Sequence, residues 1–205
     1  MNAPPLVGRA GEHERAAVVD VLHDAFVDED GLNYWLRQGA RKEPARRRFF
    51  QAAVRTAVHP KRELWLARDG GEGVGAALWL PPGVIAFDHT PLQQLLMAPL
   101  LFAIAGPDGL KRGRELGAKL AEHHPREPHA HLVFLGVASQ AQGRGVGSAM
   151  LKTMLAPLDA AGLTAYLEAS KERNVALYQR HGFEVTGAFE LPGVRFWTMT
   201  RTPRP

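Results

Sequence analysis

The chain has 205 residues, a mass of 22.4 kDa and a formal net charge of +4. It contains no cysteine, which excludes disulfide bonds, thiolate metal sites and a cysteine nucleophile. Hydrophobic residues make up 45% of the chain and charged residues 22%, proportions typical of a globular domain. We therefore expect residues 1–205 to form a single domain with a sizeable core.

Two features of the sequence bear on location and partners. The first twenty residues mix charges throughout and show no signal peptide, and the longest apolar run, 95–105, contains Pro99 and is too short to span a membrane. These features predict a cytoplasmic protein with no membrane partner. A basic run at 41–48 adjoins Phe49 and Phe50 without any nucleic-acid motif. We interpret this run as the solvated face of a helix, and we expect no nucleic-acid partner.

Hydrophobic periodicity predicts the elements of the first half of the chain. Apolar residues recur at helical spacing after Gly11, and they favour strands on both sides of the turn Asp69-Gly70-Gly71. Residues 26–35 break the helical pattern. The expected elements, in chain order, are a strand at 6–7, helices at 11–24 and 45–58, and paired strands at 63–69 and 73–80.

The second half of the chain alternates strands with helices. Pro157 is expected to kink or end the helix in which it lies. The expected elements are helices at 91–104 and 109–123, a strand at 131–137, a helix ending near 161, a strand at 164–169, a helix at 174–181, and strands at 183–185 and 195–200. This order favours a mixed α/β (α+β) fold over a doubly wound sheet.

A glycine-rich turn joins the strand ending at Val137 to the following helix. Backbone N–H groups in such a turn, together with the positive end of the helix dipole, favour a pyrophosphate. A Walker loop would close with a lysine, but Gly147-Ser148-Ala149 closes this one. A dinucleotide loop would have a glycine three residues after Gly147, where Met150 stands.

What remains is a Gln-x-x-Gly-x-Gly motif, which resembles the acetyl-coenzyme A (acetyl-CoA) loop of the GNAT (GCN5-related N-acetyltransferase) family. A second block, in a late helix and the strand after it, is also similar to that family, and within the family the chain looks most like the puromycin N-acetyltransferases and their relatives. The resemblance covers roughly residues 125–202, and the earlier half only in outline. The motif residues are Gln142, Gly145 and Gly147 in the loop, and Asn174, Tyr178, Gly182 and Phe183 in the second block.

The resemblance implies a mixed central sheet splayed between its two middle strands, with helices on both faces. It implies an acceptor-side half at about 1–130 and an acetyl-CoA-binding half at about 131–202, with acetyl-CoA as the acyl donor. The residues that would bind the coenzyme are Leu135, Gly136, Val137, Gln142, Gly143, Arg144, Gly145, Val146, Gly147, Ser148, Asn174 and Tyr178.

Tyr178 is the candidate general acid. Attack of an amine on a thioester expels a thiolate, whose conjugate acid has a pKa of about 8.5, and a phenol with a pKa near 10 can protonate it. The general base is open, because 132–137 offers no carboxylate. Glu168, expected either to act in catalysis or to pair with a basic residue, is one candidate, and His131 and His129 are others. A water chain or an already neutral substrate would also serve.

The acceptor is expected near the region after the first helix and near the long connection at 85–131. The acidic run Asp28-Glu29-Asp30 could attract a cationic amine, and aromatic residues could form flat apolar walls. No metal site is expected, because the nine histidines lack zinc-site spacing. The acceptor candidates are Asp28, Asn33, Tyr34, Trp35 and Trp79.

The function predicted from the sequence is acetyl transfer from acetyl-CoA to a primary amine of a small molecule, an aminonucleoside-type antibiotic being one candidate, by a monomer or homodimer. Two alternatives remain open at this point. One is acetylation of a protein N-terminus or lysine. The other is a non-catalytic acyl-CoA sensor or a basic nucleic-acid-associated protein.

Overall fold

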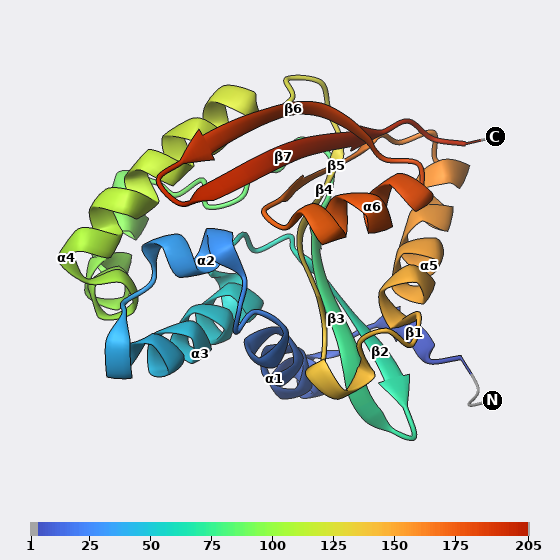
Figure 1. Ribbon diagram of the computed structural model, residues 1–205, viewed down its shortest axis with the longest axis horizontal. Helices are drawn as coiled ribbons and strands as arrows, with labels where there is room; N and C mark the ends of the chain where they lie inside the picture. Colours follow the sequence, from blue (N-terminus) through green and yellow to red (C-terminus); the bar gives the residue numbers. More distant parts are fainter. Residues whose placement is uncertain (1–3, 205) are drawn as a thin grey trace.

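A computed structural model describes residues 4–204, and a seven-stranded mixed sheet forms its centre (Figure 1). The strands lie in the order β1-β2-β3-β4-β5-β7-β6, and only the central pair β4–β5 is parallel. Their bounds are β1 Leu6–Arg9, β2 Glu63–Asp69, β3 Glu72–Leu80, β4 Ala130–Val137, β5 Ala165–Ala169, β6 Glu184–Leu191 and β7 Val194–Arg201.

Six α-helices among the described residues flank this sheet. Short turns of other helix types precede or extend several of them, at Glu12–Glu14, Gly39–Arg41, Ala53–Ala57 and Ser139–Ala141. The α-helices are α1 Arg15–Ala25, α2 Asp30–Trp35, α3 Lys42–Ala52, α4 Pro91–His123, α5 Val146–Ala160 and α6 Glu172–Arg180.

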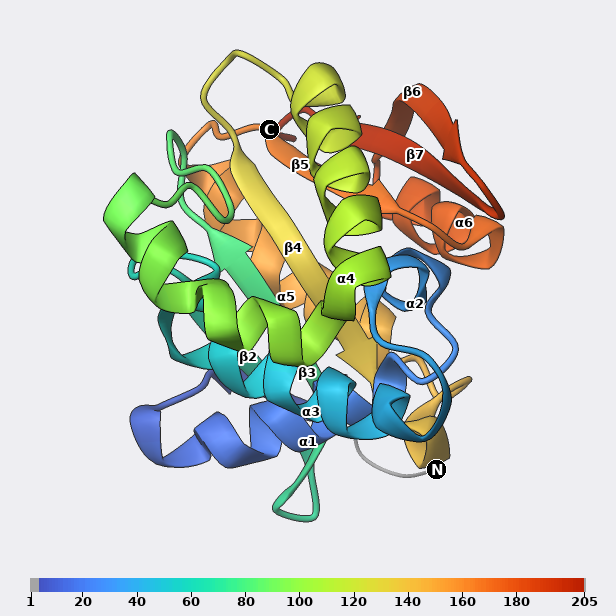
Figure 2. The ribbon, with the colours of Figure 1, turned by 90° about the vertical axis from the view of Figure 1, so that its left-hand side faces the viewer.

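The helices cover the two faces of the sheet unequally, as Figures 1 and 2 show. Helices α1, α3 and α4 pack on one face over a core that includes Leu22, Phe50 and Leu78, and α5 and α6 pack on the other over a core that includes Met150 and Leu167. A smaller third core joins α4 to the β6–β7 hairpin. We call the two sides of the sheet the α4 face and the α5 face.

The two middle strands separate soon after they begin. Pairing between β4 and β5 covers three positions and ends at Leu132 and Leu167, although β4 continues to Val137. Leu78 of β3 faces Phe134 and the next residue faces Leu132, so Val133 is an extra residue that bends β4. We call the opening beyond Leu132 and Leu167 the fork. The expected splayed sheet is confirmed.

Several predicted elements differ in detail from the observed ones. The break expected between helices at 91–104 and 109–123 appears as a change of direction at Gly106, where φ is +67° inside α4. Helix α5 continues through Pro157 to its end at Ala160. The region expected to be irregular after α1 contains α2, which begins because the Glu29 carboxylate accepts the first free N–H groups of that helix.

An ion pair fastens the end of the chain to the α5 side of the molecule. The two terminal guanidinium nitrogens of Arg201, which is 3% exposed, donate to Asp159 at 2.7 and 2.8 Å. The backbone N–H of Arg204 donates to the same carboxylate at 2.8 Å. The hydrogen bonds from Arg201 lower the pKa of Asp159, against a smaller opposing effect of burial.

This pair predicts a pH-dependent loss of stability. Asp159→Asn should lower the free energy of unfolding by roughly 1–2 kcal/mol at neutral pH, because charged hydrogen bonds are lost in a partly exposed setting. Since the folded pKa is depressed, the contribution is complete above the unfolded value of about 3.9 and is lost as the pH falls through the folded value. Denaturant unfolding of both proteins should therefore show a difference that shrinks below about pH 4. A difference that does not depend on pH would contradict this role.

Candidate active site

The glycine-rich turn forms the N-terminal end of α5 directly after β4. Gly143 and Gly145 have φ of +74° and +81°, a region that favours glycine. Gly145 is the N-cap residue and no side chain caps the helix, so its first N–H groups remain available to a ligand. The turn also leaves open space where a β-carbon at either glycine would lie. These features fit a pyrophosphate.

The end of β4 offers a free backbone edge toward the fork. Leu135, Gly136 and Val137 pair with β3 on one side, and no strand within residues 4–204 pairs with them on the other. Such an edge can accept an extended ligand as if it were an added strand. Packing also favours glycine at position 136, because a β-carbon there would lie 2.7 Å from the Ala25 side chain of α1.

Contacts between α5 and α6 bring the two predicted blocks together. The Ser148 hydroxyl lies 2.6 Å from Nε2 of His181, at the end of α6. A β-carbon at Gly147 would lie 3.5 Å from the Leu177 side chain. Gln142 donates to the Val137 carbonyl at 3.1 Å, and Arg144 pairs with Asp69 at 2.5 Å. The remaining coenzyme candidates, Val146 and Asn174, are buried and half-buried in the first turns of α5 and α6.

Tyr178 lies in α6 and is 8% exposed. Its ring packs edge-on against Phe183, with centroids 5.9 Å apart. Burial raises the pKa of the Tyr178 phenol far above its usual range, and the negative charge of Glu29 raises it further. The phenol therefore stays protonated at neutral pH, as a proton donor must.

A histidine–carboxylate pair lies at the fork on the α4 face. Nε2 of His131 lies 2.9 Å from Glu168, and Nδ1 of His124 lies 3.9 Å from the same carboxylate. Burial alone would raise the pKa of Glu168, but the charge of His131 and hydrogen bonds from its neighbours lower it on balance. Nδ1 of His131 is buried without a hydrogen-bond partner among the described residues.

Tyr166 and His129 complete the polar cluster around this pair. Their rings lie 5.1 Å apart, and each lies 5.1 Å or less from the ring of His124. Burial lowers the pKa of His129, and burial together with the Glu168 charge raises that of Tyr166. Within residues 4–204, no group of three or more His, Cys, Asp or Glu side chains is arranged to hold a metal ion.

The structure does not gather all the predicted acceptor residues in one place. Asp28 is exposed, and Asn33 donates to the Val27 carbonyl at 2.9 Å. Tyr34 donates to Glu115 at 2.9 Å, and Trp35 packs edge-on against Phe49. Trp79 points to the opposite face, where its indole N–H contacts the Met154 sulfur at 3.1 Å.

Glu29, named only within the acidic run, is the member of that run that the structure turns inward. Its carboxylate accepts N–H groups of α2 and the hydroxyl of Ser170, the residue that follows β5. The negative charge of Glu29 adds to the effect of burial in raising the pKa of the Tyr178 phenol. The contact of Glu29 with Ser170, just after β5, distinguishes it from Asp28 and Asp30 and depends on the three-dimensional fold.

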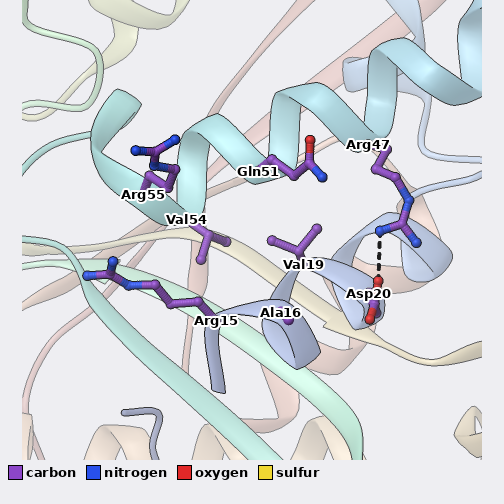
Figure 3. A pocket seen from close by; sticks show the side chains of 8 residues that line it. All are labelled: Arg15, Ala16, Val19, Asp20, Arg47, Gln51, Val54 and Arg55. Atoms are coloured by element: carbon purple, nitrogen blue, oxygen red, sulfur yellow. Dashed lines mark hydrogen bonds and ion pairs between the residues drawn. The ribbon is translucent and has the colours of Figure 1, made fainter. Parts of the chain in front are cut away.

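A separate cavity of about 520 Å³ lies between α1 and α3, and Figure 3 shows its lining. Arg47 pairs there with Asp20 at 2.8 Å, and Val19 and Val54 lie between Arg15, Arg55 and that pair. None of its lining residues belongs to the candidate site. The predicted solvated face of α3 is confirmed except at Arg46, which is 4% exposed and donates to the His23 carbonyl at 3.0 Å.

Comparison with known proteins identifies the class of this site. Residues 22–183 match the model of the acetyltransferase (GNAT) family. The chain therefore belongs to the GNAT acetyltransferase family. No helix within residues 4–204 combines the length and apolar character needed to cross a membrane.

Particular relatives agree with this class. The chain is 31% identical over 170 residues to a mycothiol acetyltransferase of Paenarthrobacter aurescens (strain TC1), a match covering 65% of this chain and 53% of that protein. The chain thus spans about half the length of that relative. A crystal structure titled histone acetyltransferase HPA2 and related acetyltransferase, from Corynebacterium glutamicum ATCC 13032, is 28% identical with a TM-score of 0.78, covering 99% and 98% of the two chains. A ribosomal-protein-S18-alanine N-acetyltransferase from Escherichia coli shares the fold at 12% identity, covering 98% and 95%, with a TM-score of 0.57.

A matched pair of variants tests the glycine turn. Gly145 and Gly162 both have positive φ, and a β-carbon at either would meet open space. Valine at either position should cost about 1–3 kcal/mol of stability through backbone strain. Gly145→Val should also weaken coenzyme A binding at least about tenfold, whereas Gly162→Val should leave it unchanged. Titration calorimetry showing native affinity in folded Gly145→Val would sink the assignment.

Proposed function

We propose that this protein transfers an acetyl group from acetyl-CoA directly to a primary amine of a small molecule. The fork carries this proposal, because the glycine turn follows one of its strands and α6 with Tyr178 follows the other. Direct transfer suits a chain that has no cysteine to form an acyl-enzyme. Acetyl-CoA would lie along the free edge of β4 with its pyrophosphate at the start of α5.

The proposed reaction needs one proton acceptor and one proton donor. The acceptor amine first loses a proton, and its nitrogen then forms a bond to the thioester carbonyl carbon. The carbon–sulfur bond breaks, and the thiolate leaves with a proton from a general acid. The nitrogen, which still carries one extra proton after the attack, releases it to solvent, and a solvent proton restores the general acid. The products are an acetamide and coenzyme A.

Tyr178 is the proposed donor. The pKa of the Tyr178 phenol is well above that of a thiol, so its proton moves late in the step. Most of the stabilisation of the developing thiolate therefore comes from the hydrogen bond that the phenol donates to the departing sulfur. Burial against Phe183 fixes the ring.

His131 is the proposed proton acceptor, with Glu168 as its positioning partner. The 2.9 Å contact between Nε2 and the carboxylate holds the tautomer whose proton lies on Nε2. This leaves the lone pair of Nδ1 to take a proton from the ammonium, directly or through a water. The carboxylate stabilises the imidazolium that results.

The acceptor is proposed to be a small molecule, in keeping with a relative named for mycothiol. An aminonucleoside such as puromycin is the finer proposal. Acetyl-CoA consumption should be measured against puromycin, polyamines, arylalkylamines and short peptides. Turnover of small amines supports the proposal. Turnover of peptides alone would replace it with protein acetylation, and coenzyme binding without any turnover would indicate a sensor.

The role of Tyr178 predicts a specific kinetic defect. Tyr178→Phe removes the proton donor and keeps the ring, so kcat should fall about 10²–10⁴-fold. Affinity for coenzyme A and the melting temperature should barely move. A phenylalanine variant that turns over at the native rate would reassign Tyr178 to packing.

The role of Glu168 predicts a change in the pH–rate profile. Glu168→Gln should lower kcat/KM most at low pH, where neutral amine is scarce, and raising the pH should recover part of the loss. If the two residues act as a unit, the double variant of Glu168→Gln and His131→Gln should lose no more activity than the worse of the two single variants. A lower melting temperature with a native pH–rate profile would leave the pair a purely structural role.

A further inference from the structure

Glu29 lies at the mouth of the fork, on the loop between α1 and α2. Its carboxylate accepts the N–H of Gly31 at 3.2 Å and that of Leu32 at 2.5 Å, and it also contacts the Ser170 hydroxyl. These contacts fix the side chain from both sides, one from α2 and one from the end of β5.

Glu29 has no ion-pair partner among the described residues, unlike its neighbour. Lys171 is the nearby cation, and its ammonium pairs with Asp30 at 2.9 Å. A carboxylate withdrawn from water is costly when only neutral donors face it. Burial accordingly raises the pKa of Glu29, against the hydrogen bonds that lower it. A cation from outside the chain would supply the missing charge.

The position of Glu29 relates it to the reacting groups. Tyr166 and Glu168 of β5 lie on the α4 face, because the residues between and beside them belong to the core on the α5 face. Ser170 extends that polar row by one step, and Glu29 meets its hydroxyl. The negative charge of Glu29 also raises the pKa of Tyr178, in addition to the larger effect of burial.

We infer that the Glu29 carboxylate binds the ammonium group of the acceptor and so selects substrates that arrive as cations. The inference rests on the proposed function and specifies its substrate class as primary alkylammonium ions. The ammonium binds beside Glu29, its proton passes to Nδ1 of His131, and the neutral amine attacks the thioester. A neutral molecule of the same shape gains nothing from the carboxylate.

Two probes of similar shape and different charge test the inference: 2-phenylethylamine and 2-phenylethanol. Their binding to the protein saturated with coenzyme A is measured by calorimetry at pH 7. No turnover occurs, because coenzyme A carries no acetyl group. The native protein should bind the ammonium at least about tenfold more tightly than the alcohol. Glu29→Gln should weaken ammonium binding about ten- to a hundredfold, because hydrogen bonds to charged groups are worth about 1.5–3 kcal/mol. Binding of the alcohol should not change.

Glu172→Gln is the matched control, because it removes one exposed carboxylate at the start of α6. It should keep the native preference for the ammonium. Glu29→Asp keeps the charge and remains a good helix cap, so it should stay folded and retain more of the preference than Glu29→Gln.

The inference is overturned if the native protein does not prefer the ammonium, or if folded Glu29→Gln keeps the native preference. If Glu29→Gln unfolds, Glu29→Asp decides, and complete loss of the ammonium preference in that folded, still charged variant also overturns it. Coenzyme A affinity separates failure of the inference about Glu29 from failure of the proposed function. Intact coenzyme binding without ammonium preference rejects only the role of Glu29, whereas absent coenzyme binding in the native protein rejects the proposed function itself.

Discussion

The early end of hydrogen bonding between β4 and β5 is the constraint on which the rest of this structure depends. The two strands pair at three positions, and the extra residue Val133 bends β4 at the point where they part. Unpaired strand edges are normally covered or blunted, because they invite pairing with another chain. Here the helices on both sides leave the edge of β4 facing the fork. A coenzyme that pairs with this edge would form hydrogen bonds with the β4 backbone groups that do not pair with β5.

The fork also brings together side chains that the two faces of the sheet would otherwise separate. In a continuous sheet, residues on the α4 face and residues of α6 on the α5 face lie on opposite sides of a hydrogen-bonded layer. Where the strands part, the negative charge of Glu29 contributes to the raised pKa of Tyr178 in α6.

The sequence predicted the elements with strong local signals. The glycine turn, α5, β5 and α6 follow from periodicity and from glycines at positions whose positive φ other residues rarely adopt, such as Gly145. Helix α2 was missed because six residues carry too weak a periodic signal, and its start depends on the Glu29 side chain. The contact between His131 and Glu168 joins residues on different strands. The expectation that Glu168 is either functional or paired follows from burial, and its partner depends on strand register.

The two carboxylates at the fork illustrate how environment divides similar groups between tasks. Glu168 faces histidines, which lower its pKa and hold it charged, so it suits the fixed role of orienting an imidazole. Glu29 accepts hydrogen bonds from neutral donors, and the nearby Lys171 pairs with Asp30, so burial raises the pKa of Glu29 on balance. The sequence places Glu168 between apolar residues and Glu29 within an acidic run. The register of β4 with β5 gives Glu168 a side-chain partner, whereas Glu29, held by α2 and Ser170, is the carboxylate that we infer to bind a cation.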